Sequence, residues 1–311
     1  MAEEYIVALI RHCLGNGYHP KDWRKAIAVA LRKPRKPDYS LPRAYRLIQL
    51  LECLGKVLEA IVAKRLGYLV GRHNLVPGNQ FGGRSHYSTT DAILSFTHDI
   101  QTAWTDGKVT SALTFDIKGY FDFVNHRRLL CELRRKRIPL QLVKWVDSFL
   151  TEREAAVCLD GIRGEMKGVQ NGIPQGSPVS PILAAFYSAE LLEMFEEHAN
   201  NPHNNLPLPD SPTQVTLFVY VDDGMLFVSS RSLDTNIALL RSAYQRTDRW
   251  LRSVGLAPDL AKRELMHYTR RPKDGSPAIR LQEADGSTST IAPTAFVKWL
   301  GVHFDRCHDL I

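Results

Sequence analysis

The sequence lacks several features that would place the protein in other structural classes. In its 311 residues no apolar run is long enough to cross a bilayer, so nothing indicates a membrane-spanning helix. The five cysteines are scattered, with no CxxC pair and no metal-ligand spacing, which argues against a disulfide framework and a structural zinc site. Residues 1–15 place Glu3 and Glu4 ahead of a helix-like apolar pattern, unlike a secretory signal or a transit peptide. We therefore expect an intracellular protein without a membrane partner.

Positive charge is abundant and unevenly placed. The net charge is +7, and residues 11–72 contain 14 Lys or Arg against 4 acids. Such an excess is typical of a surface that meets a polyanion. A solvated basic face would have the same composition, so charge alone leaves both interpretations open.

Apolar spacing along the chain predicts alternating short strands and helices. Residues 26–31 favour a strand. From Leu47 to Leu69 apolar residues recur at steps of three and four, which predicts one long amphipathic helix. Ser88 and Asp91 have the spacing of a capping box, which predicts the start of another helix.

Two adjacent aspartates interrupt a stretch that is otherwise typical of buried strands. In FVYVDDGMLFV, residues 218–228, apolar arms flank Asp222 and Asp223, which favours a hairpin with the acids at its tip. Asp116 ends another short apolar strand, SALTFDI, and is the obvious third member of an acidic cluster. The pair alone would also suit an ordinary tight turn before Gly224, so it does not decide between a turn and a site.

A cluster of three carboxylates is costly without a cation. Two carboxylates about 4 Å apart repel by about 4 kcal/mol at an effective dielectric of 20. Oxygen ligands of this kind suit Mg²⁺. In-line phosphoryl transfer uses two such ions, one at the attacking 3′-hydroxyl and one at the leaving pyrophosphate. A phosphate substrate would also match the basic excess of the chain.

Five stretches, taken in order along the chain, carry a family resemblance. They are TFDIKGYFDFVNH, NGIPQGSPVSPIL, YVDDGMLFV, GLAPDLAKRELMHY and VKWLGVHFD. These blocks resemble those of the reverse transcriptases, and within them the non-LTR (LINE-like) retrotransposon group, over about residues 18–305. The chain departs from the family's usual pattern at Arg46-Leu47-Ile48, where the family has Arg-Pro-Ile, and at Gly224-Met225, where a β-branched pair is more usual.

The resemblance implies an α+β fold, the fingers and palm of a right-hand polymerase, with an antiparallel palm sheet packed on helices. We expect fingers with an N-terminal extension in residues 1–110 and a palm in 111–305 with a fingers insertion around 125–180. Residues 306–311 would be a tail, and the family's helical thumb would be largely absent. The chain then resembles a fingers-palm fragment of a longer polyprotein, a truncated element copy or a shortened domain, and we expect weak duplex binding because much phosphate-contacting surface would be missing.

The resemblance also assigns roles to individual residues. Asp116, Asp222 and Asp223 match the catalytic, metal-binding aspartates, with the carbonyl of Ile117 as a further ligand of two Mg²⁺ ions, for which Mn²⁺ could substitute. Phe121 matches the bulky residue that leaves no space for a 2′-hydroxyl and so favours deoxynucleotides, the alternative being an ordinary core aromatic.

The remaining matches concern the nucleotide and the primer. The residues that match dNTP-binding positions are Lys33, Arg46, Phe121, Gln175, Gly176 and Lys262. The positions that match the primer grip are Trp299, Leu300 and Gly301. Of these, Lys262 is a candidate proton donor to pyrophosphate, although an exposed lysine in a salt bridge would look the same in sequence.

The function implied is that of an RNA-directed DNA polymerase, which adds dNTPs to a DNA primer on an RNA template. Two alternatives stay open: an RNA-directed RNA polymerase that shares the palm, and a catalytically idle, basic RNA-binding remnant or domesticated scaffold. Residence in the nucleus, the cytoplasm or both follows only from the resemblance. Protein partners and oligomeric state have no signal in the sequence.

Overall fold

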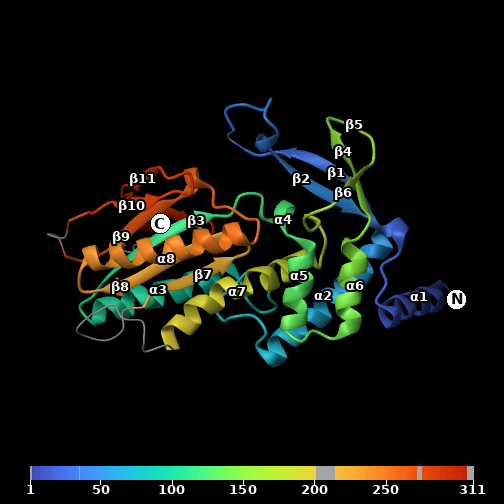
Figure 1. The fold of residues 1–311 in the computed structure, drawn as a ribbon, viewed down its shortest axis with the longest axis horizontal. Coiled ribbons are helices and arrows are strands. Elements are labelled where there is room, and N and C mark those ends of the chain that lie inside the picture. Colours follow the sequence, from blue (N-terminus) through green and yellow to red (C-terminus); the bar gives the residue numbers. More distant parts are fainter. Residues whose placement is uncertain (1, 35, 201–213, 272–274, 307–311) are drawn as a thin grey trace. The chain divides into compact units, whose positions relative to one another are not determined.

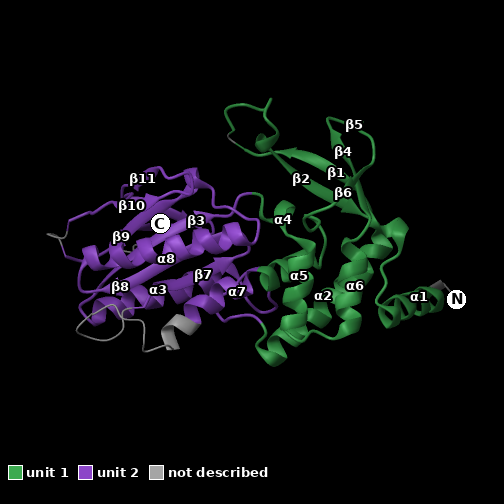
Figure 2. Cartoon of the chain, in the orientation of Figure 1, with its two compact units in different colours: residues 1–75, 119–187 green, residues 76–118, 188–311 purple. Residues whose placement is uncertain are grey.

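The computed structural model describes residues 2–34, 36–200, 214–271 and 275–306 of the chain, which fold as two compact units (Figure 2). Unit 1 comprises residues 1–75 and 119–187, and unit 2 comprises residues 76–118 and 188–311. An Asn- and Pro-rich stretch at 199–213 has the composition of a surface loop, but 201–213 lie outside the described residues. So do Cys307 and the rest of the expected tail beyond residue 306.

Unit 1 contains a small mixed sheet (Figure 1). Its strands are ordered β2-β1-β4-β5, with β6 also paired to β4; β1 pairs antiparallel with β2 and parallel with β4. The strand predicted at 26–31 is therefore confirmed. The bounds are β1 Lys25–Arg32, β2 Tyr45–Leu51, β4 Arg153–Leu159, β5 Ile162–Arg163 and β6 Lys167–Val169.

The single long helix predicted from Leu47 to Leu69 was wrong at its start. Residues 45–51 form strand β2, and helix α2 begins only at Cys53 and ends at His73. Leu47 and Leu50 are exposed in the strand and belong to no buried helical stripe. The pairing of β2 with β1 along seven residues satisfies the backbone, and it overrides a spacing of apolar residues that fits a helix equally well.

The helices of unit 1 bury aromatic and aliphatic side chains. Helices α5 and α6 contact each other, and α1 packs on α6. A 3-10 turn, η1, precedes β1, and another, η2, precedes β2. The bounds are α1 Ala2–Asn16, η1 Lys21–Arg24, η2 Pro42–Ala44, α4 Tyr120–Phe123, α5 His126–Arg135 and α6 Leu140–Leu150. Helix α7, Ser180–Asn200, belongs to unit 1 up to Tyr187 and to unit 2 from Ser188.

Unit 2 is built on an antiparallel sheet of four strands ordered β7-β8-β3-β9. Helix α8 contacts β8 and β3, and helix α3 contacts the same two strands. The helices cover opposite faces, because Phe96 of α3 packs on Phe227, whereas Tyr244 of α8 packs on Phe115, which points the other way. The bounds are α3 Thr89–Thr105, β3 Val109–Asp116, β7 Thr216–Tyr220, β8 Asp223–Ser230, α8 Leu233–Ser253 and β9 Glu264–Tyr268.

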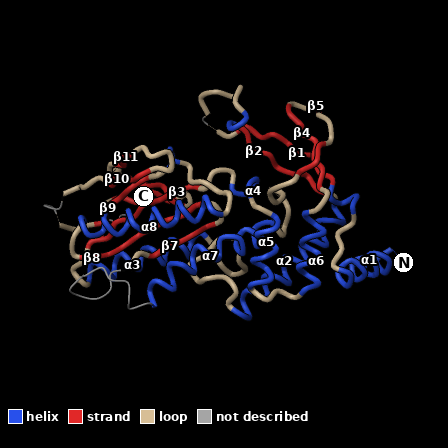
Figure 3. The backbone as a smooth tube through the Cα atoms, in the orientation of Figure 1, coloured by secondary structure: helices blue, strands red, loops and turns tan. Residues whose placement is uncertain are grey.

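Two further hairpins and one short turn belong to unit 2. Figure 3 labels the strands of the first hairpin, β10 and β11. The first hairpin joins β10, Ile279–Gln282, to β11, Thr288–Ile291, and the second joins β12, Phe296–Trp299, to β13, Val302–Asp305. The 3-10 turn η3, Leu260–Lys262, lies between α8 and β9.

The expected α+β fold with an antiparallel sheet packed on helices is confirmed. Helix α3 also begins as predicted, since Ser88 and Asp91 exchange both hydrogen bonds of a capping box. The division into fingers at 1–110 and palm at 111–305 stays a prediction. None of the helices in the described part of the chain is long and apolar enough to cross a membrane.

Candidate active site

The aspartates singled out in the sequence meet at one edge of the sheet in unit 2. Asp116, the last residue of β3, pairs directly with Asp223, the first residue of β8. Paired residues of antiparallel strands lie on the same face, with Cβ atoms about 4.5–5.5 Å apart. Asp222 immediately precedes Asp223, and its carbonyl accepts a 3.0 Å hydrogen bond from the N–H of Ile117. Two segments separated by about a hundred residues thus bring three carboxylates together.

The turn between β7 and β8 is strained at Val221. Tyr220 pairs with Asp223, so Val221 and Asp222 form a two-residue turn, and Val221 adopts φ +60°. This conformation is rare for a β-branched residue and costs on the order of 1–3 kcal/mol. The sequence had indicated Val221 as part of a strand arm, which was wrong by one residue.

A neighbouring segment holds this turn in place. The N–H of Phe81 donates to the carbonyl of Val219 at 2.9 Å, so residues 79–81 pair with β7. A Cβ on Gly82 would come within 2.5 Å of the backbone nitrogen of Val221, so only glycine allows this approach. The only sign of Gly82 in the sequence is a Gly-Gly pair near a helix start, which does not predict this contact.

Charge at the site is unbalanced toward the negative. Burial, followed by the charges of Asp222 and Asp116, raises the pKa of Asp223 to about 6. Lys262 opposes this, since its Nζ lies 2.7 Å from Oδ2 of Asp116. Burial alone would lower the pKa of Lys262, but the hydrogen bond and charge of Asp116 outweigh it and raise that pKa. Lys262 therefore stays protonated beside the acids.

Backbone contacts fix Lys262 at this place. The N–H of Asp259 donates to the carbonyl of Asp116 at 2.7 Å, and the N–H of Lys118 donates to the carbonyl of Ala257 at 2.9 Å. The side chain of Asp259 then caps the short turn η3 by accepting from Ala261. Residues 257–262 thus continue along the end of β3 and deliver the ammonium group to Asp116.

The donor set suits a hard divalent cation, although the side chains do not already surround one point. Among the described residues no group of three or more carboxylate, imidazole or thiolate side chains is arranged to hold a metal ion. Asp116 is turned to Lys262 instead. The carboxylates of Asp116, Asp222 and Asp223 are oxygen ligands of the kind that Mg²⁺ and Mn²⁺ prefer. Because burial and then the charges of Asp222 and Asp116 raise the pKa of Asp223, added positive charge would favour its ionised form.

Gly224 has a structural role that the sequence did not predict. A Cβ at this residue would lie 2.3 Å from Cζ of Phe115, whose ring covers the glycine across the strand pair. Phe115 in turn packs edge-on against Tyr244 of α8. A β-branched residue, usual in the resembling family, would require this ring to move. Gly224 therefore leaves room for the ring of Phe115, which is the residue directly before Asp116.

In unit 1 the stretch around Gln175 and Gly176 forms a tight loop against β2. The carbonyl of Gln175 accepts a 2.7 Å hydrogen bond from the N–H of Gln49. Gly176 has φ +126°, and a Cβ there would lie 2.6 Å from the carbonyl oxygen of Gln49. The loop therefore needs glycine at 176, both for its conformation and for its close approach to the strand.

Lys33 and Arg46 lie at one end of the β1–β2 pair. The N–H of Lys33 donates to the carbonyl of Ala44 at 2.8 Å, and Arg46 pairs with Leu31. With this register the two basic residues are diagonal neighbours on one face, about 7–8 Å apart. Nζ of Lys33 donates to the carbonyl of Arg43 at 3.2 Å. The structure thus brings these two predicted phosphate-binding residues together within unit 1.

Phe121 lies in the short helix α4 and is only partly buried, which disfavours an ordinary core role. Its carbonyl accepts from the N–H of Ile173 at 2.8 Å, and its ring meets Tyr120 edge-on. Gly172 allows this contact, because a Cβ there would lie 2.7 Å from the carbonyl oxygen of Phe121. Helix α4 and the loop that carries Gln175 are thus packed together.

The predicted primer grip falls on the β12–β13 hairpin. Leu300 and Gly301 form its two-residue turn, both with positive φ. Trp299 is buried in the core cluster with Phe227 and Met225, on the sheet face that also bears Asp223. Its ring packs against that of Phe96, 6.1 Å away. Trp299 therefore anchors the hairpin, and Leu300 of the turn is partly buried against the same cluster.

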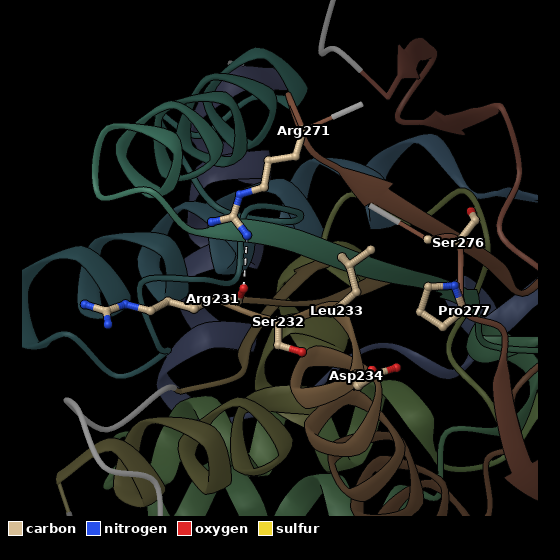
Figure 4. Close-up of a pocket in the computed structure, with 8 residues that line it drawn as sticks. Arg231, Ser232, Leu233, Asp234, Arg271, Ser276 and Pro277 are labelled. Carbon is tan, nitrogen blue, oxygen red and sulfur yellow. Dashed lines mark hydrogen bonds between the residues drawn. The ribbon is translucent and has the colours of Figure 1, made fainter. Parts of the chain in front are cut away.

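A hollow of about 510 Å³ in unit 2 lies among other residues (Figure 4). Arg271 closes one side of it and donates to the carbonyl of Arg231 at 3.2 Å and to that of Gly107. No residue assigned to nucleotide or metal binding contributes to it. Its lining residues are Arg231, Ser232, Leu233, Asp234, Arg271, Gly275, Ser276 and Pro277.

The sequence matches the profile of one protein family over residues 32–304. That family is described as reverse transcriptase (RNA-dependent DNA polymerase). The curated relatives include the RNA-directed DNA polymerase from the mobile element jockey of Drosophila melanogaster, 25% identical over 98% of this chain and 31% of the relative. Another is the probable RNA-directed DNA polymerase from transposon X-element of the same species, 25% identical over 97% of this chain and 31% of the relative. The chain thus spans under a third of these relatives.

Solved structures share the fold. The apo telomerase of Candida tropicalis superposes with a TM-score of 0.61 over 100% of this chain and 53% of that one, at 11% identity. A form of it truncated from the C-terminal domain gives a TM-score of 0.62 over 93% of this chain and 55% of that one. At 11% identity the likeness concerns the fold alone.

Proposed function

The chain belongs to the reverse transcriptase family, and from this premise we propose that it is the polymerase core of a non-LTR retrotransposon, an RNA-directed DNA polymerase. The observation that carries the proposal is the direct pairing of Asp116 with Asp223 beside Asp222, with the Lys262 ammonium on Asp116. Enzymes of phosphoryl transfer commonly use a cluster of acidic side chains, which binds divalent cations, together with a nearby positively charged group. The proposed partners are an RNA template, a DNA primer and dNTPs, inside the cell in the nucleus, the cytoplasm or both.

In the proposed reaction the 3′-oxygen of the primer forms a bond to the α-phosphorus of a dNTP, and the bond to pyrophosphate breaks. Asp116, Asp222, Asp223 and the carbonyl of Ile117 would hold two divalent cations, Mg²⁺ or Mn²⁺. Once bound, such ions favour the deprotonated 3′-hydroxyl and offset charge on the leaving group. The strained turn at Val221 presents Asp222, and the strand pair presents Asp116 and Asp223.

Lys262 has the chemistry of a proton donor in this scheme. Its contact with Asp116 keeps a proton on Nζ, and the turn η3 holds that nitrogen at the acids. Pyrophosphate accumulates negative charge as it leaves, so a nearby ammonium both attracts it and supplies a proton. The salt bridge foreseen as an alternative for Lys262 is present, and it is compatible with this role.

Nucleotide recognition is assigned to residues of unit 1. Lys33 and Arg46, diagonal neighbours on β1 and β2, would bind the triphosphate, Arg46 through two parallel donors. The half-buried ring of Phe121 would exclude a ribose 2′-hydroxyl by occupying its space. The loop of Gln175 and Gly176 would contact the base pair, and the turn Leu300-Gly301 the primer.

Primer extension on a homopolymer RNA template, with Mg²⁺ or Mn²⁺, tests the proposal. Asp222→Ala should lower incorporation by about 100-fold or more, since it removes charge that acts on the transition state. Asp285→Ala, an exposed acid in the β10–β11 turn of the same unit, is the matched control and should retain activity. Incorporation that survives Asp222→Ala rejects the site. RNA binding with no incorporation by any variant favours the idle scaffold.

A further inference from the structure

Helix α2 carries a fully buried acid whose presence the proposed chemistry does not explain. Glu59 is 0% exposed, between Leu58 and Val62 on the buried face of the helix. Its Oε2 accepts a hydrogen bond of 2.5 Å from the hydroxyl of Ser177. Its Oε1 is also buried and has no hydrogen-bond partner among the described residues. A carboxylate in this place is costly, because half of its acceptors are unused.

The surroundings of Glu59 offset only part of that cost. Arg153 of β4, itself buried, and Lys56 of α2 are the charged groups that favour the ionised form, but neither lies within salt-bridge distance of the carboxylate. Burial outweighs them and raises the pKa of Glu59. Replacing such a buried charge by an apolar residue of similar volume usually leaves a protein equally stable or more stable. A contribution to overall stability is therefore a poor reason for an acid here, whereas the orientation of Ser177 is a specific one.

Ser177 is the central residue of the loop that carries Gln175 and Gly176. Its N–H donates to the carbonyl of Pro174 at 3.2 Å, and its hydroxyl oxygen accepts from the N–H of Val179, also at 3.2 Å. The same hydroxyl donates its only proton to Glu59. Glu59 thus fixes the orientation of the Ser177 hydroxyl. That hydroxyl then links Glu59 of α2 to the N–H of Val179 in the loop.

The loop has a second attachment to the same continuous stretch of chain. The N–H of Gln49 in β2 holds the carbonyl of Gln175, and β2 leads through a single residue, Glu52, into α2 with Glu59. Strand β2 also carries Arg46. The continuous segment of β2 and α2 therefore contacts the loop at two places, Gln49 and Glu59, and also carries the proposed triphosphate ligand Arg46.

We propose that Glu59 is a positioning residue that acts through Ser177 to hold Gln175 and Gly176 in register with Arg46 for the incoming nucleotide. This role rests on the function proposed above, in which those three residues contact the dNTP. Glu59 itself does not meet the substrate. Its substitution therefore changes how well the loop is held, and through that the Michaelis constant for the nucleotide.

Hydrogen exchange of the unliganded chain tests the structural half of the proposal without any requirement for activity. Glu59→Met keeps the volume and removes the acceptor, so the amides of Ser177 and Val179 should exchange about 10-fold faster, the effect of losing about one hydrogen bond. Glu59→Gln retains an acceptor for Ser177 and should stay within about threefold of wild type. The matched control is Glu132→Met in α5, which removes another buried acid of unit 1, one that is paired with Arg135 of the same helix.

A second variant keeps the test independent of how Glu59→Met folds. Ser177→Ala removes the donor and should accelerate exchange at Val179 to a similar degree. The double variant Glu59→Met/Ser177→Ala should add little further, because both changes break one link. Additive effects, or equal acceleration in Glu132→Met, would show that Glu59 supports the unit in general, and would overturn the proposal.

Steady-state kinetics tests the functional half. Glu59→Met should raise KM for dNTP about 10-fold with kcat changed less than about threefold, and Glu59→Gln should restore most of the loss. A fall in kcat with unchanged KM would contradict the assigned role. Should the wild-type chain incorporate no nucleotide, the proposed function fails, and the exchange experiment still decides whether Glu59 holds the loop.

Discussion

A ring packed over a glycine lies directly beside the acidic pair of β3 and β8. Phe115 and Gly224 are paired across β3 and β8, one residue away from the pair Asp116 and Asp223. The ring lies over the glycine and packs on Tyr244. The ring-over-glycine contact therefore packs the strand pair directly beside the acids, and it adds no charge of its own.

We expect Gly224→Ala to destabilise the chain by about 1–3 kcal/mol, since the added Cβ forces the Phe115 ring out of its place. Urea unfolding measures this. Gly168→Ala, in strand β6 with open space around its Cβ, is the control and should change the free energy of unfolding by less than about 0.5 kcal/mol. Phe115→Leu combined with Gly224→Ala should recover part of the loss. Equal stability of the two alanine variants would refute this account.

Phe121 decides between DNA and RNA synthesis in the proposed function. In Phe121→Ala the space for a ribose 2′-hydroxyl opens, so the preference for dNTP over rNTP, as a ratio of kcat/KM, should fall by about 10- to 200-fold. Phe123→Ala, an exposed ring in the same helix α4, should leave the ratio unchanged. A wild-type chain that already prefers ribonucleotides would instead support the RNA polymerase alternative.

Residue types and spacing in the sequence were enough to find the acids but not their supports. Asp116 and Asp222 each follow an apolar strand, and a charge in that setting stands out. Glu59 gave a weaker signal that was available: it shares a helical face with Val62, Leu66 and Val70, all buried, at spacings of three, seven and eleven. Gly224 could not be interpreted from the sequence, because its partner Phe115 is distant along the chain.

At the scale of elements, β3 and the strands around Asp222 were predictable because they are short, apolar and bounded by turn signals. Strand β2 was not, because Leu47, Leu50 and Leu51 continue the three-four spacing of helix α2 without a break. The start of α2 also lacks a signal, since Glu52 makes no side-chain capping bond. What separates the two elements is pairing with β1, a contact that no local pattern contains.

The turn between β7 and β8 illustrates the same limit. A hairpin with acids at its tip was foreseen, yet the strained residue is Val221, and a β-branched residue with positive φ is not what turn preferences suggest. The strain persists because residues 79–82 hold the turn from the side. Elements were therefore predictable where local preference agrees with tertiary contact, and they were missed where contact overrides it.

At the scale of the whole molecule, each compact unit carries residues with proposed roles of its own: Asp116, Asp222, Asp223 and Lys262 belong to unit 2, and Lys33, Arg46 and Phe121 belong to unit 1. The stability of each unit therefore matters to function. In unit 1 an aromatic cluster surrounds His19, whose ring is fully buried edge-on against Trp145 and Phe149, each 5.2 Å away. Neither ring nitrogen has a hydrogen-bond partner among the described residues. A neutral imidazole is therefore favoured among these rings, because a protonated one would be a buried charge without a hydrogen-bond partner.

Unit 1 should consequently lose stability in mild acid. Burial, then the charges of Arg153 and Arg24, lowers the pKa of His19 from 6.5 to about 3. A group with a lowered folded-state pKa binds its proton more readily when unfolded, so its contribution is complete above pH 6.5 and declines as the pH falls toward 3. At pH 5 the free energy of unfolding is lower than at pH 7 by about 2 kcal/mol.

His19→Leu removes the titration, so its urea midpoint, followed by tryptophan fluorescence, should decline less than that of wild type between pH 7 and 5. His12→Leu, an exposed histidine on α1, should follow wild type. Parallel profiles for His19→Leu and wild type would show that the aromatic cluster tolerates the charged ring.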